Sequence, residues 1–87
     1  MSYEVVFKPS AERQLLKLEK QLQKRITGKL IQLQANPRSA GAIKLSGSAR
    51  TWRVRVGDYR IVYEIDDSAA ILFVTIIAHR REVYRDL

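Results

Sequence analysis

The stretch Trp52–Tyr63 constrains the fold more than any other, because it reads as two short strands joined at Gly57-Asp58. Glycine at the first central position of a two-residue loop is typical of a type II′ hairpin turn. Such a turn pairs Val56 with Tyr59 and, further along, Trp52 with Tyr63. Successive strand residues point to opposite faces, so this register predicts one apolar face, which should pack on helices. Its members are Trp52, Val54, Val56, Tyr59, Ile61 and Tyr63.

The same register places Arg53, Arg55 and Arg60 together on the opposite face, which we call the arginine face. Arg55 stands directly across from Arg60, and like charges opposite each other on a sheet are destabilising. One interpretation is a solvated surface on which long side chains splay apart. The other, which we favour, is a site for clustered phosphates, because planar guanidinium groups bind phosphate in a bidentate manner.

The N-terminal part predicts one strand and two helices. Tyr3–Lys8 has the alternation of a strand, and Ser10 is placed to cap a following helix. Apolar residues then recur at helical spacing as far as Leu33, and Asn36-Pro37 ends the pattern. One helix over residues 11–35 would be about 38 Å long, which exceeds the diameter of a compact domain of this size. We therefore expect a two-helix hairpin broken near residues 19–21.

The C-terminal part predicts strands after a long connection over residues 37–50. Three strands are expected, at Trp52–Val56, Tyr59–Ile65 and Ala70–Ala78, with a turn at residues 66–68 and then a short tail or helix. The fold class is α+β, in the order β-α-α-β-β-β with a three-strand antiparallel meander. We expect a single domain over residues 1–87.

The charge of the chain indicates an anionic partner. The net charge is +7, and residues 38–60 alone carry six basic side chains and one acidic one. There is no cysteine and one histidine, so we expect neither a metal site nor another cofactor. The N-terminus lacks the pattern of a signal peptide, and the longest apolar run is too short for a membrane helix. We expect a cytoplasmic protein without membrane contact.

The end of the chain adds groups suited to RNA chemistry. His79, Arg80, Arg81 and Tyr84 follow the last expected strand. Tyr84 is either an apolar anchor for the tail or an aromatic face for a base with a hydroxyl for proton transfer. His79 is either a surface histidine or a group that moves a proton. Trp52 could stack on a base, but its position in the alternation favours the core. RNA binding and metal-free cleavage through the 2′-hydroxyl are both consistent with these side chains.

Three segments carry a family resemblance: KLSG (44–47), WRVRVGDYRIVYEI (52–65) and AHRREVYR (78–85). Together with the preceding strand and basic helices, they resemble the RelE/ParE superfamily of bacterial toxins, and within it the RelE-type messenger-RNA interferases. The resemblance implies the toxin of a type II toxin–antitoxin system. It further implies a metal-independent endoribonuclease that cuts messenger RNA in the ribosomal A site through attack of the 2′-hydroxyl, and so inhibits translation.

The resemblance also assigns roles to residues. Arg60 would hold the scissile phosphate, Arg80 would stabilise the transition state, and Tyr84 would stack on a base and take part in proton transfer. The identity of the general base stays open: arginine is a poor base, and His79, next to Arg80, could fill this role. We assign RNA binding to further cations, namely Arg53, Arg55, Lys44, Arg50 and Arg81.

The expected partners are a RelB-like antitoxin with an acidic or amphipathic segment, the 70S ribosome and messenger RNA. Two alternatives stay open. One is a ParE-type inhibitor of DNA gyrase without ribonuclease activity, and the other is a basic protein that binds nucleic acid without catalysis.

Overall fold

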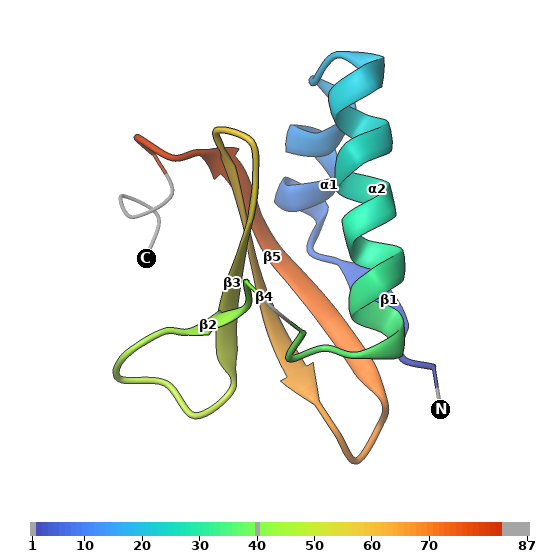
Figure 1. Cartoon of the computed structure of the whole chain (residues 1–87), viewed down its shortest axis with the longest axis vertical. Helices are drawn as coiled ribbons and strands as arrows, with labels where there is room; N and C mark the ends of the chain where they lie inside the picture. The colour runs from blue at the N-terminus through green and yellow to red at the C-terminus, as the bar shows by residue number, and fades with distance from the viewer. Residues whose placement is uncertain (1, 40, 83–87) are drawn as a thin grey trace.

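The computed structural model describes residues 2–39 and 41–82 of the 87-residue chain. It has two layers, a twisted sheet and a pair of helices that covers one face of it (Figure 1). This α+β architecture confirms the expected fold class. The elements in chain order are β1 (Glu4–Phe7), α1 (Pro9–Leu16), α2 (Lys20–Ala35), β2 (Ile43–Lys44), β3 (Thr51–Val56), β4 (Tyr59–Asp66) and β5 (Ile71–His79).

The strands form one sheet in the order β1-β5-β4-β3-β2. The antiparallel meander β3-β4-β5 is confirmed, and two features add to it. The short strand β2 lies inside the connection 37–50 and pairs with β3 over Trp52 and Arg53. The first strand, β1, is the parallel member of the sheet and lies against β5. No helix among the described residues combines the length and apolar character needed to span a membrane.

The hairpin between β3 and β4 has the predicted register at every pair from Trp52↔Tyr63 to Val56↔Tyr59. Gly57 has a φ of 58°, whereas Asp58 is not among the residues with positive φ. A type II′ turn requires positive φ at its first central residue alone, and a type I′ turn requires it at both. The backbone therefore agrees with the turn expected from the sequence.

The main core lies between the helix pair and the apolar face of the hairpin. Ile26 and Leu33 of α2 and Ile61 of β4 are fully buried there. Trp52 packs against the same cluster, which confirms its expected place in the core. Tyr63 is also fully buried and donates a hydrogen bond to the carbonyl of Pro37 at 2.7 Å. Burial raises the pKa of Tyr63 to about 12.

Two details of the helices differ from the expectation. The predicted cap at Ser10 was wrong, because α1 begins two residues earlier than expected, with Pro9 in its first turn and Lys8 as the cap. Proline suits that position because its φ is already helical and the missing N–H has no helical partner there. The break between the helices lies at residues 17–19 rather than 19–21. The side-chain amide of Gln23 stabilises it by donating to the carbonyl of Leu18 at 2.7 Å.

A polar cluster ties the N-terminus to the turn between β4 and β5. Arg38 donates two hydrogen bonds to the Asp67 carboxylate, at 2.8 and 3.2 Å, and the Tyr3 hydroxyl donates a third at 2.6 Å. The guanidinium of Arg38 also lies 5.7 Å from the ring centroid of Trp52. The Arg38 hydrogen bonds, followed by that of Tyr3, lower the pKa of Asp67.

The lowered pKa of Asp67 predicts a loss of stability in acid. A carboxyl group whose pKa is lower in the folded than in the unfolded chain stabilises the fold at pH values above its unfolded pKa of about 3.9. This contribution is lost as the pH falls through the folded pKa. Urea unfolding from pH 7 to pH 2 should show Asp67→Asn less stable than wild type at pH 7, with a gap that closes in acid. Asp58→Asn, in the exposed hairpin turn, is the control. A gap that stays constant with pH would contradict the linkage.

Candidate functional site

The arginine face occupies the side of the sheet that the helices leave open. Arg55 pairs with Arg60, which pairs with Ala78 of β5, and of the rows on this face this one lies nearest the hairpin turn. The next row along the strands contains Arg53 and Val62, followed by Ile76. Rows two residues apart are separated by roughly 7 Å. The structure therefore brings Arg53, Arg55 and Arg60 together on two neighbouring rows.

The three guanidinium groups differ in exposure. Arg55 is exposed, Arg53 is half-buried, and Arg60 is 9% exposed with its Nη1 donating to the carbonyl of Tyr59 at 3.3 Å. The Nε of Arg53 is covered and has no hydrogen-bond partner in the described chain. A covered donor without an acceptor is uncommon in native structures.

The salt bridges of the described residues lie away from Arg53 and Arg55. Salt bridges within residues 2–39 and 41–82 join Arg38 to Asp67 and Arg50 to Asp66, and neither involves Arg53 or Arg55. Arg53 and Arg55 are therefore not balanced by Asp66 or Asp67, which leaves these two guanidinium groups able to bind an external anion.

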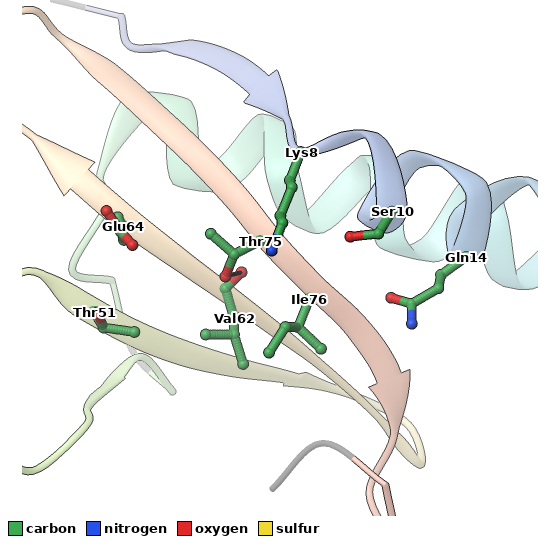
Figure 2. A pocket seen from close by; sticks show the side chains of 8 residues that line it. All are labelled: Lys8, Ser10, Gln14, Thr51, Val62, Glu64, Thr75 and Ile76. Carbon is green, nitrogen blue, oxygen red and sulfur yellow. Dashed lines mark hydrogen bonds between the residues drawn. The ribbon is translucent and has the colours of Figure 1, made fainter. Parts of the chain in front are cut away.

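A hollow of about 480 Å³ adjoins the arginine face (Figure 2). Its floor includes Val62 and Ile76, which form a small apolar cluster on this side of the sheet. Lys8 reaches over β5 from the end of β1, while Glu64 lies at the far end on β4. Sequence reasoning missed this hollow, although the alternation Arg60, Val62, Glu64 already placed Glu64 on the arginine face.

His79 does not join the arginine face. It pairs with Tyr59, and the two rings meet edge to face with centroids 5.6 Å apart. Tyr59 shares the side of the sheet that carries Ile61 and the helices, so His79 lies on that side as well. Its Nδ1 accepts a hydrogen bond from the backbone N–H of Arg81 at 3.2 Å.

The remaining predicted cations are dispersed. Arg80 follows β5, and its backbone N–H donates to the carbonyl of Asp58 at 2.7 Å, which holds it beside the hairpin turn. Arg81 is exposed next to it.

Lys44 pairs with Trp52 and so belongs by register to the other face. Arg50 contacts Asp66 at 3.5 Å, at the end of β3 remote from the turn. Tyr84 lies outside the described residues.

The acidic and histidine side chains of the described residues form no group of three or more that could hold a metal ion. The arrangement instead suits a polyanion. Cations on neighbouring rows of one rigid sheet can contact successive phosphates of a single strand, and Arg80 extends the positive surface past the turn.

Solved structures similar to this one include bacterial and archaeal toxins. A mutant of the E. coli toxin RelE bound to an antitoxin RelBc peptide is 27% identical, with a TM-score of 0.79 over 99% of this chain and 94% of that one. The archaeal RelE-RelB complex from Pyrococcus horikoshii OT3 is 25% identical, with a TM-score of 0.81 over 92% and 97%. The toxin-antitoxin complex RelBE2 from Mycobacterium tuberculosis is 28% identical, with a TM-score of 0.65 over 92% and 100%.

The sequence itself matches a family model over most of its length. Residues 5–84 match the model described as the ParE toxin of type II toxin-antitoxin system, parDE, whereas no curated protein matches. The matched range includes both helices, the whole arginine face and the start of the tail. The chain therefore belongs to the ParE toxin family of type II toxin–antitoxin systems, within the RelE/ParE superfamily.

Proposed function

We propose that this toxin is a ribosome-dependent endoribonuclease that cleaves messenger RNA in the A site without a metal ion. The observation that carries the proposal is the arginine face, where Arg53, Arg55 and Arg60 share two neighbouring rows of the sheet. Arg53 and Arg55 have no salt bridge to any described carboxylate. The similarity in fold to RelE toxins supports the same reaction class.

The reaction needs no group from outside the RNA and the protein. The 2′-hydroxyl oxygen attacks the neighbouring phosphorus while its proton passes to a base. The bond from phosphorus to the 5′-oxygen breaks, and that oxygen takes up a proton. The products are a 2′,3′-cyclic phosphate and a 5′-hydroxyl. Negative charge grows on the phosphate oxygens along this path, so fixed guanidinium groups stabilise the transition state more than the ground state.

The residues divide this work by position. Arg60 is rigidly held in the sheet and binds the scissile phosphate. Arg53 and Arg55 bind adjoining phosphates. Arg80, tied to the hairpin turn through its backbone, stabilises the transition state. For Tyr84 we retain the role implied by the family resemblance, which is to stack on a nucleobase and to take part in proton transfer.

His79 is better suited to positioning than to general base catalysis. Its side chain lies on the helix side of the sheet, and its Nδ1 is already an acceptor for the Arg81 N–H. The ring contact holds His79 against Tyr59 of β4, and the hydrogen bond ties the start of the tail to His79, so we assign His79 to orienting Arg80 and Arg81.

An antitoxin partner follows from the family and from the charge. Related RelE toxins are solved in complex with RelB. An acidic or amphipathic antitoxin segment laid over the arginine face would neutralise the same cations that bind RNA. The uncovered side of the sheet provides the surface for such a segment.

Inhibition of DNA gyrase without RNA chemistry is the second candidate. The observation in its favour is the family model itself, which describes a ParE toxin. In that case the positive surface serves protein or DNA binding alone.

Primer extension on purified ribosomes programmed with a defined message tests the proposal. We expect cuts within the A-site codon that appear when toxin is added. In excess EDTA, these cuts should persist for as long as the ribosomes stay assembled. The matched assay measures gyrase supercoiling with the same preparation. An uncut message together with blocked supercoiling would establish the gyrase alternative. If the message is uncut and supercoiling is also unaffected, the chain is a binding protein without catalysis.

A further inference from the structure

We propose that the hollow beside the arginine face is a nucleobase pocket, and that Glu64 selects the bases it accepts. The ligand is a base of the same RNA strand whose phosphate the arginines hold. This inference rests on the proposed function for its substrate, and it assigns to the pocket a role separate from catalysis.

The position of the hollow supports this assignment. Its floor begins on the row of Arg53, because Val62 pairs with Arg53 on one side and Ile76 on the other. Glu64 lies one row further from the turn, in register with Thr51. Neighbouring rows are roughly 7 Å apart, a length that a ribose spans between its phosphate and its base. A phosphate on the arginines thus leaves its base over the hollow.

The size and lining of the hollow fit a base. Its volume of about 480 Å³ lies within the range of roughly 300–1,000 Å³ seen for small-molecule sites. Ile76, which is 9% exposed, is the accessible apolar part of the floor and can contact the flat face of a base, while Val62 beside it is fully buried. The polar side chains stand around that floor (Figure 2).

One wall of the hollow is held by a specific hydrogen bond. The N–H of Ile77 points outward from β5 beyond the end of β1, and the Oε1 of Gln14 accepts it at 3.1 Å. This bond fixes the side-chain amide and leaves its Nε2 as a donor. Lys8, on the same side, is a second donor. The α1 side of the hollow can therefore donate to acceptor atoms of a base.

Glu64 provides the opposite chemistry at the far end. It forms no salt bridge within the described residues and lines the hollow. An ionised carboxylate accepts hydrogen bonds and donates none. Adenine, cytosine and guanine each carry an exocyclic amino group with two N–H donors for it, whereas uracil can offer only the single N3–H of its ring. The pocket should therefore disfavour uracil.

Titration with short ligands tests this inference independently of cleavage. The probes are the dinucleotides ApA, CpC, GpG and UpU, each with deoxyribose as the first sugar so that no 2′-hydroxyl can attack. Amide chemical shifts of the free chain report binding by NMR. We expect base-dependent shifts at Thr51, Glu64 and Thr75, and a Kd for UpU about tenfold weaker than for the other three.

Two variants isolate the contribution of Glu64. Glu64→Gln keeps the shape and adds a donor, so the tenfold discrimination against UpU should narrow to about twofold. Glu4→Gln makes the same charge change at an exposed site on β1 and should leave the discrimination intact.

The outcomes separate this inference from the proposed function. Shifts confined to Arg53, Arg55 and Arg60, with equal affinity for all four probes, would overturn the pocket and leave the phosphate site standing. Base-dependent shifts in the hollow without cleavage on programmed ribosomes would sustain the pocket and refute the nuclease. Absence of any shift on this face would overturn the pocket, and cleavage on programmed ribosomes would then decide the nuclease separately.

Discussion

Replacing Arg60 with alanine is expected to reduce cleavage of ribosome-bound message by about 100- to 1,000-fold, the range seen when one fixed donor to a developing oxyanion is removed. Arg60 is the most buried cation of the arginine face, at 9% exposure, and lies between Arg55 and Ala78 in the sheet. Such a group needs little reorganisation as charge develops on the phosphate. Single-turnover cleavage measured with saturating toxin separates this effect from weaker ribosome binding.

Alanine at this buried position also removes packing, so a second variant is needed. Arg60→Lys retains the charge but not the bidentate fork, and should lose at least about tenfold while remaining close to wild type in urea unfolding. Arg13→Ala, an exposed cation of α1 in the helical layer, is the matched control and should cleave normally. Full activity in both Arg60 variants would refute the assignment of the scissile phosphate to this residue.

Leu33→Ala is expected to destabilise the fold by about 2–5 kcal/mol, the usual cost of truncating a buried leucine. Leu33 is 0% exposed and belongs to the cluster through which α2 packs on the sheet. A domain of 87 residues has a modest core, and total stabilities are about 5–15 kcal/mol. The substitution therefore removes a large fraction of the total, which urea unfolding followed by circular dichroism measures.

The same helix supplies the control for this prediction. Ile31 lies two residues away but is 61% exposed, so Ile31→Ala should change the free energy of unfolding by no more than about 0.5 kcal/mol. Equal losses in the two variants would show that helix propensity, rather than burial against the sheet, sets the effect.

The hairpin could be predicted in full because two local signals agree on it. Gly57 determines where the chain turns, and the alternation of Trp52–Val56 determines which face is buried, so every pair of β3 and β4 follows. The break between α1 and α2 carries no such signal. It depends on the hydrogen bond from the Gln23 side chain to the carbonyl of Leu18, and helical periodicity in the sequence does not distinguish these two positions from their neighbours.

The site was predictable only where it lies on that hairpin. Arg53, Arg55 and Arg60 were placed together by alternation alone. His79 was expected near them, but the register between β4 and β5 shifts by one residue, so Val62 pairs with Ile76 while Tyr63 pairs with Val74. The extra residue, Thr75, reverses the facing of everything that follows it, and His79 points to the helices. The hollow depends on the same shift and on Gln14 from a distant helix.

The short length of β2 has a consequence for the isolated protein. Its two residues pair with Trp52 and Arg53, so the upper half of β3, Val54–Val56, forms an open border of the sheet within the described chain. An edge strand with unpaired backbone groups can pair with the edge strand of another copy, which leads to aggregation. Two copies meeting there would bring Arg55 of one copy close to Arg55 of the other. Mutual repulsion of these cations would keep the toxin dispersed until an anionic partner arrives.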